Sequence, residues 1–441
     1  MMEMTVIGLG YLGLTHAACM ASLGHTVIGL DHDLTRIGAI ASGQQWLYEP
    51  GLHDLVEKQM SNGKLRISNN YHDAATTAHL HFLAVGTPAD ENGRTDLIAI
   101  QQALTQLVPL LRGSHVIVGK STVPAGTCAQ LQQLIRSLQH ADAQIELVWN
   151  PEFLREGNAI ADTLHPERIV VGLQQGSSLQ AFFEQLYAPM LAEGVPLIVT
   201  DWATAELSKV AANAFLALKL SFINAVSDMC GQHDADIGDV AQILGLDSRI
   251  GSQYLRAGLG YGGGCLPKDV QGFIAAARDA QIESVPALFN AVTAINETRI
   301  TNALDDALRL VPTPAGAKIA VLGCAFKPNS DDIRHSPALA LARGLSQHAV
   351  DVHVYDPKAG AHVRASVPEV TVQETLVACV EDAQLVIIAT EWDEFVKLDP
   401  IWLQQVVAKK KVLDLRNCLD LRQWQAAGWE YRGIARGHVS V

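Results

Sequence analysis

The chain has 441 residues, about half of them hydrophobic, and a formal net charge of −14. This length predicts two or three domains, and the acidic balance argues against a protein that binds nucleic acid through its charge. No charge-free apolar stretch is long enough to span a membrane, and the N-terminus MMEMTVIGLG lacks the basic start of a signal peptide. We therefore expect a cytoplasmic protein without membrane or nucleic-acid partners.

Short apolar runs alternate with helical segments through residues 1–200. Continuous apolar runs separated by helices are typical of buried parallel strands, so this part is predicted to form an α/β sheet domain. The runs are MTVIGLG (4–10), HTVIGLD (25–31), LHFLAVGTP (80–88), SHVIVGKST (114–122), IELVWNPE (145–152), RIVVGL (168–173) and PLIVT (196–200).

The pattern changes after Asp201. Residues 203–230 contain no Gly or Pro and carry apolar residues along their whole length, which predicts one long, mostly buried helix capped by Thr200 or Asp201. More helix is predicted over 285–308. Strand-like runs return at KIAVLGCAFKP (318–328), VDVHVYDP (350–357), AQLVIIAT (383–390) and KKVLDL (410–415).

This layout predicts an α/β fold class with two Rossmann-like, doubly wound domains joined by an all-α middle domain. The expected bounds are 1–200, 201–310 and 311–441, with VPTPAG (311–316) as the linker. The seven cysteines are scattered, odd in number and include no CxxC pair. They predict reduced thiols rather than a disulfide framework or a metal site.

The segment Gly8-Leu9-Gly10-Tyr11-Leu12-Gly13 closes a predicted strand and opens a predicted helix. Its glycines would allow a tight turn, an approach of the pyrophosphate and close helix packing, so Gly8, Gly10, Tyr11, Leu12 and Gly13 are predicted to bind a dinucleotide. Asp31 ends the next strand and would hold the ribose 2′-hydroxyl, which favours NAD. Arg36 nearby is also assigned to the cofactor, although an arginine there is able to accept a 2′-phosphate.

The segment GLGYGGGCLPKDV (258–270) surrounds Cys265 with glycine and then places Lys268 and Asp269 close behind. The glycines would let a ligand approach the backbone, and Pro267 would start a helix. A thiol at a helix N-terminus near a lysine is expected to have a lowered pKa and to act as a nucleophile. Beside an NAD site it suggests oxidation of an aldehyde through a thioester. The alternative is a structural thiol in a loop.

The chain resembles the UDP-glucose/GDP-mannose dehydrogenase family in motifs spread over its full length. The resemblance implies that a sugar CH2OH is oxidised to a carboxylate in a single site that uses two NAD in turn. The matching motifs are GLGYLG, LYEPGL (47–52), VGTP (85–88), STVPAGT (121–127), NPEFLREG (150–157), ELSKVAANAF (206–215), RIG (249–251), GYGGGCLPKD (260–269) and GCAFKPNSDDIR (323–334).

The resemblance also implies roles for single residues. Cys265 would be the nucleophile, Lys209 and Asn213 would stabilise the oxyanion, and Thr122, Glu152 and Asp269 would organise water or move protons. Further NAD contacts would come from Thr87, Thr122, Glu156, Lys268 and Arg334. Nucleotide-sugar contacts would come from Glu152, Phe153, Leu154, Lys209, Asn213, Arg249, Tyr254, Leu255, Arg256, Tyr261, Gly262 and Lys327.

Arg249 resembles an arginine that reaches the substrate from a neighbouring subunit, which implies a homodimer with active sites completed across its interface. The catalytic cleft is expected between the domains. Arg416 also resembles a family position but is not counted among the site residues. Gly264 stands where many members have Ser, and Gly86 where Asn is common; neither change removes a group that the chemistry needs.

The charged residues among these also have a purely structural interpretation, without a role in catalysis or binding. Lys209 would pair with Glu206 one helical turn earlier, Glu152 and Glu156 would lie on a solvated helix face, and Lys327 and Arg334 would be surface charges.

Two other functions remain open. A single-step hydroxy-acid dehydrogenase has no use for Cys265, and a catalytically silent NAD-binding regulator would not need Cys265, Lys209 and Glu152 together. The stretch from RIG to GYGGGC favours UDP-glucose as the substrate, with GDP-mannose, UDP-GlcNAc, UDP-ManNAc and dTDP-glucose as alternatives.

Overall fold

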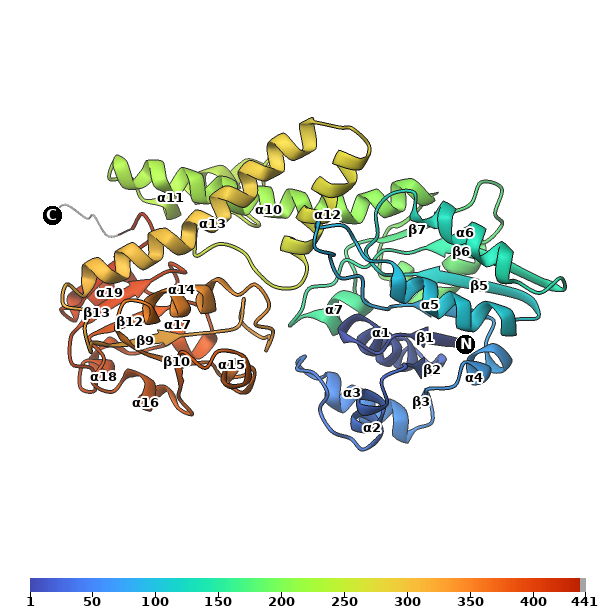
Figure 1. The fold of residues 1–441 in the computed structure, drawn as a ribbon, viewed down its shortest axis with the longest axis horizontal. Coiled ribbons are helices and arrows are strands. Elements are labelled where there is room, and N and C mark those ends of the chain that lie inside the picture. The colour runs from blue at the N-terminus through green and yellow to red at the C-terminus, as the bar shows by residue number, and fades with distance from the viewer. Residues whose placement is uncertain (437–441) are drawn as a thin grey trace. The chain divides into compact units, whose positions relative to one another are not determined.

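The computed structural model describes residues 1–436, which divide into two compact units (Figure 1). Unit 1 comprises Met1–Ala212 with Gln271–Ala276, and unit 2 comprises Asn213–Val270 with the chain from Ala277 onward. Helix α10 (Trp202–Gln232) begins in unit 1 and continues into unit 2. The predicted helical middle segment, 201–310, therefore contributes residues to both units.

Unit 1 is built on an eight-stranded sheet with the order β3-β2-β1-β4-β5-β6-β7-β8. Its pairs are parallel except β6 with β7, which meet in antiparallel fashion at the single pair Trp149↔Gly172. The predicted apolar runs match every strand except the short, half-polar β3. The strands are β1 (Glu3–Ile7), β2 (Thr26–Leu30), β3 (Leu65–Ser68), β4 (Leu80–Leu83), β5 (Gly113–Gly119), β6 (Ala143–Trp149), β7 (Ile169–Leu173) and β8 (Leu197–Asp201).

Helices cover both faces of this sheet, which explains why its strands are apolar on both sides. One buried cluster joins the sheet to α1, α3, α8 and α9, and a second joins it to α4, α5 and α6. The helices are α1 (Tyr11–Ser22), α2 (Leu34–Ala41), α3 (Leu52–Ser61), α4 (Tyr71–Thr77), α5 (Ile98–Leu107), the 3-10 turn η1 (Val108–Leu110), α6 (Thr127–Leu138), α7 (Ala159–Leu164), α8 (Gln180–Leu186) and α9 (Ala188–Ala192).

Unit 2 contains a parallel six-stranded sheet with the order β11-β10-β9-β12-β13-β14. The two edge strands, β11 and β14, were not predicted because one is only two residues long and the other is largely polar. The strands are β9 (Lys318–Leu322), β10 (Asp351–Tyr355), β11 (Thr371–Val372), β12 (Leu385–Ile388), β13 (Lys411–Asp414) and β14 (Glu430–Gly433).

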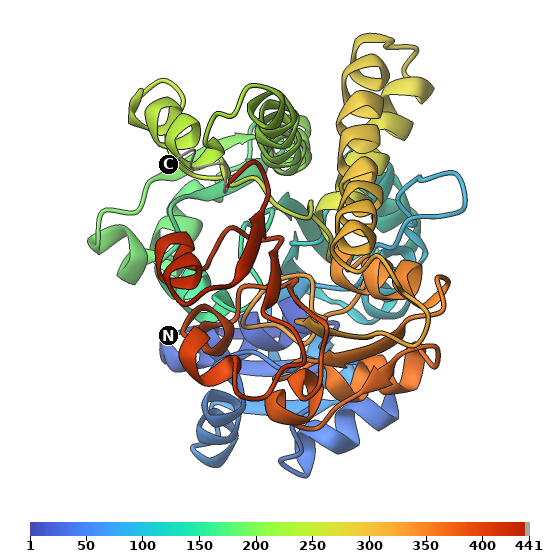
Figure 2. The ribbon, with the colours of Figure 1, turned by 90° about the vertical axis from the view of Figure 1, so that its left-hand side faces the viewer.

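The long helix α13 (Ser284–Leu310) ends in the helical layer of unit 2, where it packs against α14 (Figures 1 and 2). A Cβ on Gly344 of α14 would lie 3.3 Å from Leu304 of α13, so the small residue brings the two helices close together. The other helices that unit 2 wholly or partly contains are α11 (Ile237–Leu246), α12 (Leu266–Asp279), α14 (Pro337–Ser346), α15 (Gly360–Ser366), α16 (Leu376–Val380), α17 (Asp393–Val396), α18 (Pro400–Leu403) and α19 (Leu421–Ala426).

The two sheets share one anchoring device. In unit 1, Asp31 follows β2 and accepts the backbone N–H of Leu9 in the turn after β1, at 2.6 Å. In unit 2, Asp356 follows β10 and accepts the N–H of Cys324 in the loop after β9, at 2.7 Å. In each case a buried carboxylate fixes the segment that leaves the sheet's first strand.

Helix α10 is long and apolar enough to cross a membrane by length and composition. Its polar side chains are nevertheless used inside the protein: Ser221 donates to the carbonyl of Val292, and Asn224 accepts the N–H of Gly258. Such contacts are those of a helix packed against other protein segments.

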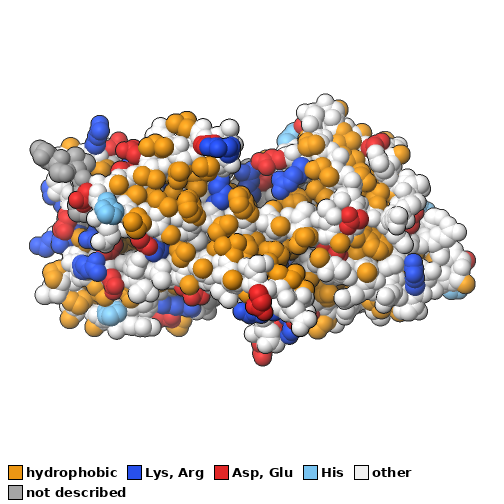
Figure 3. Space-filling model, turned by 90° about the horizontal axis from the view of Figure 1, so that it is seen from above, with side chains coloured by type: hydrophobic (Ala, Val, Ile, Leu, Met, Phe, Trp, Pro, Cys, Tyr) orange, Lys and Arg blue, Asp and Glu red, His pale blue; other side chains and the backbone are white. Residues whose placement is uncertain are grey.

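One side of α10 and α11 exposes large apolar side chains. Phe215, Phe222 and Met229 recur at every seventh residue of α10, and Ile243 and Leu246 of α11 are exposed as well. Figure 3 looks down on the face that carries these helices and shows hydrophobic side chains gathered there.

Candidate functional site

The turn after β1 has the geometry that a dinucleotide pyrophosphate requires. Gly8 adopts φ +94°, and a Cβ at Gly13 would lie 1.7 Å from the carbonyl oxygen of Gly8, so a side chain is excluded there. A Cβ at Gly10 would meet no atom within 4 Å, so the backbone at the start of α1 faces open space. A phosphate is able to approach the N–H groups of that helix end, and the predicted NAD site fits these residues.

Asp31 lies beside this turn, as the predicted ribose contact should. Burial raises the pKa of Asp31, but hydrogen bonds from the Asp33 and Leu9 N–H groups and from Arg36 outweigh it, and the net pKa is lowered. Arg36 Nη1 lies 2.7 Å from Asp31 Oδ2, and its guanidinium is also 5.0 Å from the ring centroid of Trp46. Arg36 therefore forms an ion pair with Asp31, and this pair uses part of the hydrogen-bond donor capacity of the Arg36 guanidinium.

Tyr11 and Leu12, the middle of the glycine motif, have internal partners. The Tyr11 hydroxyl bonds to Glu49 and accepts the N–H of Gly157 at 2.8 Å, while Leu12 packs against the core. Burial, followed by the bond to Glu49, raises the pKa of Tyr11. Glu49 was not predicted as a site residue, although the LYEPGL motif contains it. Its carboxylate also accepts the N–H groups of Gly157 and Ala159, and so holds the segment next to Glu156.

Several predicted residues of unit 1 meet at the carboxyl ends of β4, β5 and β6. Thr87 donates to the carbonyl of Thr122 at 2.9 Å, which links the loops after β4 and β5. Glu152, after β6, accepts the N–H groups of Phe153 and Leu154 at 2.6 and 2.8 Å. The Glu152 side chain is 17% exposed, so it does not lie on a solvated helix face.

Lys209 is buried on α10, and among the residues described its ammonium makes no ion pair with Glu206. Glu206 instead accepts the N–H groups of Gly126 and Cys128 at the start of α6, at 2.7 and 2.6 Å. The Lys209 ammonium lies 5.4 Å from the ring centroid of Phe153. The alternative prediction, an ion pair between Lys209 and Glu206, is therefore wrong. The Lys209 ammonium instead makes a cation–π contact with Phe153.

In unit 2, Cys265 is exposed and directly precedes α12. One turn later Asp269 is buried, and its N–H donates to the Cys265 carbonyl at 2.9 Å. Asp269 receives a hydrogen bond from the Asn213 amide at 2.6 Å and an ion pair from Lys268 at 2.7 Å. Three predicted residues are thus joined in one cluster, buried at Asn213 and Asp269, at the start of the helix that follows the thiol.

The glycines before Cys265 make room for other segments of the protein. A Cβ at Gly262 would lie 2.1 Å from the carbonyl oxygen of His335, and one at Gly263 would lie 2.8 Å from the ring of Phe326. A Cβ at Gly264 would lie 2.5 Å from the guanidinium carbon of Arg334. The segment after β9 therefore packs onto the glycine-rich loop, and a Ser at Gly264 would displace Arg334.

The predicted nucleotide-sugar residues of unit 2 occupy varied environments. Tyr261 is buried and bracketed by Asn296, which accepts its N–H and donates to its carbonyl. Tyr254 has a positive φ of 63°, and the adjacent Leu255 is buried while Arg256 is exposed. Arg249 pairs with its neighbour Asp247 at 2.6 Å and its side chain is 87% exposed.

Lys327 and Arg416 lie on the carboxyl side of the second sheet's strands. Lys327 Nζ is 5.5 Å from the ring centroid of Phe326. Arg416, which follows β13, donates to the carbonyl of Ala389 at 2.7 Å and pairs with Glu391 at 3.5 Å. Its side chain is mostly buried, so it is not a surface charge. Ligands of open α/β sheets bind at this edge.

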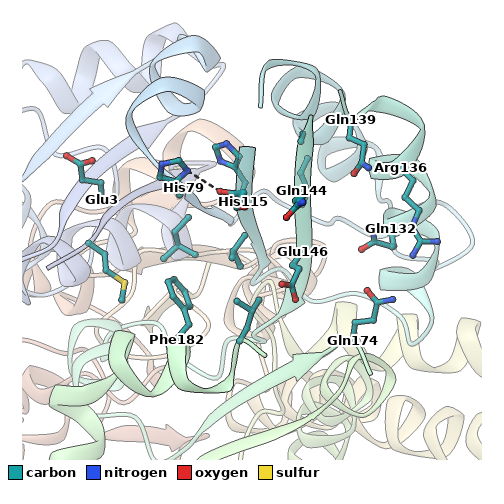
Figure 4. A pocket seen from close by; sticks show the side chains of 17 residues that line it. Glu3, His79, His115, Gln132, Arg136, Gln139, Gln144, Glu146, Gln174 and Phe182 are labelled. Carbon is teal, nitrogen blue, oxygen red and sulfur yellow. Dashed lines mark hydrogen bonds between the residues drawn. The ribbon is translucent and has the colours of Figure 1, made fainter. Parts of the chain in front are cut away.

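A hollow of about 750 Å3 opens elsewhere in unit 1, at the amino ends of β1, β4, β5 and β6 (Figure 4). His79, His115, Gln144 and Glu146 line it, together with Phe182. The glycine turn and Glu152 lie at the opposite, carboxyl end of these strands. The hollow therefore lies away from the predicted NAD-binding and catalytic residues of unit 1, although it is large.

Comparison with known proteins gives matches along nearly the whole chain. Three models of the UDP-glucose/GDP-mannose dehydrogenase family match it: the NAD binding domain over 2–191, the central domain over 203–298 and the UDP binding domain over 320–421. UDP-glucose 6-dehydrogenase TuaD of Bacillus subtilis is 38% identical, with 100% of this chain and 94% of that protein covered. UDP-glucose 6-dehydrogenase of Rhizobium meliloti is 38% identical, with 99% and 100% covered.

Solved structures give the same picture. A UDP-glucose dehydrogenase of Pyrobaculum islandicum matches with a TM-score of 0.89 and 34% identity, covering 99% of this chain and 98% of that one. A UDP-D-ManNAc dehydrogenase of Pyrococcus horikoshii matches with a TM-score of 0.85 and 26% identity, covering 99% and 100%.

Proposed function

The chain belongs to the UDP-glucose/GDP-mannose dehydrogenase family, and we propose that it oxidises UDP-glucose at C6 to UDP-glucuronate through a thioester on Cys265. It is an NAD-dependent dehydrogenase of nucleotide sugars. The observation that carries the proposal is the exposed Cys265 thiol at the start of α12, one turn before the buried Asp269–Asn213 pair. A single-step dehydrogenase or a silent NAD-binding protein has no need of this arrangement.

NAD, when bound at the Gly8–Gly13 turn, supplies the hydride acceptor for each of the two oxidations. In the first, the hydroxyl oxygen on C6 would give its proton to one of the groups assigned to proton movement, Glu152 or Asp269, and the C6 carbon would give up a hydride, which leaves an aldehyde. The Cys265 sulfur then adds to the aldehyde carbon, and the oxygen becomes an alkoxide. Loss of a second hydride turns this thiohemiacetal into a thioester.

The alkoxide needs donors, and Lys209 and Asn213 lie four residues apart on α10, on one face of that helix. Asn213 has two amide protons, of which one is donated to Asp269. The other remains available for an oxyanion. We assign these two residues to oxyanion stabilisation on that basis.

Hydrolysis of the thioester requires an activated water. Glu152 would accept a proton from water as the water attacks the acyl carbon, the C–S bond would break, and Cys265 would leave as thiolate. Thr122 and Asp269 would help to order this water or to relay protons. The products are a carboxylate and the Cys265 thiolate, and the enzyme ends the cycle unchanged once Glu152 has released its proton to solvent.

We further propose that residues 1–200 hold NAD, that 201–310 supply oxyanion groups and dimer contacts, and that 311–441 hold the UDP. The chain would act in the cytoplasm, which its free cysteines support. Phe215, Phe222, Met229, Ile243 and Leu246 form an exposed apolar surface whose cover in solution would be a second copy of the chain (Figure 3).

In such a homodimer, Arg249 would complete the neighbour's site. Arg249→Ala should raise the KM for UDP-glucose far more than the KM for NAD. Full activity from a verified monomer would rule out the shared site.

The test of the function is a stoichiometry. With limiting UDP-glucose and excess NAD, absorbance at 340 nm should report two NADH for each UDP-glucose, and mass spectrometry should find UDP-glucuronate with little free aldehyde. One NADH per substrate, or an accumulating aldehyde, would contradict the thioester route.

A second candidate is the same chemistry on another nucleotide sugar, because a UDP-D-ManNAc dehydrogenase shares the fold at a TM-score of 0.85. A panel of UDP-glucose, UDP-ManNAc, UDP-GlcNAc, GDP-mannose and dTDP-glucose would separate these substrates by kcat/KM.

A further inference from the structure

Lys120 stands next to Glu152 because of the register of two paired strands. In β5 and β6, Gly119 pairs with Trp149, and the Asn150 N–H donates to the Gly119 carbonyl at 2.8 Å. The residues that follow, Lys120 and Asn150, thus leave the sheet side by side at its carboxyl edge. Glu152 follows two residues later.

Lys120 is a buried cation with two polar partners. Its side chain is only 6% exposed, and its ammonium lies 3.3 Å from Glu152 Oε2 and 3.1 Å from Asn150 Oδ1. Asn150 is itself fixed: its amide donates to the Val170 carbonyl at 2.7 Å, and its Oδ1 also accepts the Tyr187 hydroxyl at 2.6 Å. A buried charge is retained only where it is paired, and here the pairing is with Glu152.

The two oxygens of Glu152 are held in different ways. Oε1 accepts two backbone N–H groups, from Phe153 and Leu154. Oε2 is left to Lys120, so the ammonium decides where this second oxygen lies. Without Lys120, the carboxylate would keep its tether to the backbone, while Oε2 would lose its charged partner.

The charges of Lys120 and Glu152 contribute, after burial, to the pKa shifts of the titratable groups around them. Burial, followed by the charge of Lys120, lowers the pKa of His16. Burial, followed by the charge of Glu152, raises the pKa of Cys19 to about 12 and also raises that of Tyr187. These side chains are therefore neutral at physiological pH, and within residues 1–436 Lys120 is the cation that pairs with Glu152.

We propose that Lys120 is a positioning residue that sets the orientation and charge balance of Glu152 for the attack of water on the thioester. This inference rests on the proposed function. In the step concerned, a proton passes from water to Glu152, the water oxygen bonds to the acyl carbon, and the C–S bond to Cys265 breaks. Lys120 contacts none of the reacting atoms and acts only through Glu152.

Pre-steady-state kinetics of Lys120→Met test the proposal. The two hydride transfers precede hydrolysis, so the variant should release a burst approaching two NADH per site and then turn over about 10- to 100-fold more slowly than wild type. Intact-protein mass spectrometry should find the mass of an acyl adduct, and peptide mapping should place it on the peptide that contains Cys265. Lys120→Arg, which keeps the charge, should restore most of the turnover and abolish the adduct.

A control separates this effect from a loss of folding. Lys318, a partly buried lysine of β9, donates to the Ala378 carbonyl at 3.0 Å, and Lys318→Met should show neither burst nor adduct. If Lys120→Met does not fold, Lys120→Gln keeps a polar group there and is measured in the same way.

The outcomes distinguish the two hypotheses. If wild type fails to yield two NADH per UDP-glucose, the proposed function is wrong. If wild type does so and the Lys120 variants lose the burst and the steady rate equally, with no adduct, then Lys120 has only a structural role.

Discussion

Asn213 donates a hydrogen bond from its side-chain amide to Asp269, with 2.6 Å between Nδ2 and Oδ2, and both side chains are buried. This bond ties the long helix α10 to the first turn of α12, the helix that Cys265 precedes. One contact thus links a proposed oxyanion donor to the helix that follows the proposed nucleophile, Cys265.

Asn213→Ala should affect both stability and activity. It leaves a buried carboxylate oxygen without its donor, which should lower the free energy of unfolding by about 1–3 kcal/mol. Loss of an oxyanion donor should lower kcat by about 10²- to 10³-fold. Urea unfolding and steady-state kinetics measure the two effects, with Asn92→Ala, at an exposed turn, as the control. Unchanged kcat would remove Asn213 from the oxyanion site.

Cys265→Ser should stall after the second hydride transfer. A serine hydroxyl is able to add to the aldehyde slowly, but its ester is harder to hydrolyse than a thioester, because a thiolate from a group of pKa about 8.5 is the better leaving group. Incubation with UDP-glucose and NAD should add the mass of a UDP-glucuronoyl group to the peptide containing residue 265. Cys265→Ala should gain nothing. Wild-type turnover by the Ser variant, or an adduct in the Ala variant, would mean that Cys265 is not the acyl carrier.

Gly262→Ala and Gly264→Ala form a matched pair within one loop, because neither glycine has a positive φ. The new methyl group at 262 would meet the His335 backbone, which has little freedom to move, and should cost about 1–3 kcal/mol of stability. At 264 it would meet the end of the flexible Arg334 side chain, so the stability cost should be smaller. Displacing Arg334, a predicted NAD contact, should instead raise the KM for NAD. Equal melting temperatures in the two variants would contradict this packing.

His81 makes the folded chain sensitive to acid. Burial, followed by the nearby His115 and His79, lowers the pKa of His81 to about 3, whereas an unfolded histidine titrates near pH 6.5. Between these values the unfolded chain binds a proton that the folded chain does not. Stability should therefore fall as the pH falls through this window, by up to about 1.4 kcal/mol per pH unit from this group.

Urea unfolding between pH 7 and 5 measures this slope. The slope should be shallower in His81→Gln, while the exposed control His72→Gln should follow wild type. An identical slope in His81→Gln would show that another group is responsible.

The sequence allowed the Rossmann elements to be predicted because their signal is local. The glycine turn, Asp31 and the apolar strands each depend on residues close together in the chain. Strand β14 is polar and short, and it pairs only at an edge, so no periodic pattern identifies it. The resemblance pointed to Cys265, Asp269 and Asn213, and the structure brings these three together in unit 2.

Other features depend on contacts between distant segments and could not be predicted. The glycines before Cys265 accommodate Phe326, Arg334 and His335, which lie some sixty to seventy residues later in the chain. Lys120 was missed although it directly precedes the STVPAGT motif, because only the pairing of β5 with β6 shows that it faces Glu152.

Asp31 and Asp356 occupy equivalent places in the two sheets, each after the second strand in chain order, and each has a structural role there. Each also accepts a backbone N–H two residues beyond itself, from Asp33 and Lys358 respectively. Both units use this carboxylate to hold the segment that leaves the first strand, so the proposed ribose contact of Asp31 would be a second role of the same side chain. Under the proposed function, discrimination between a dinucleotide and a sugar nucleotide would then come from the connection after the first strand. That connection is the short glycine turn 8–10 in one half and the long segment 323–336 in the other.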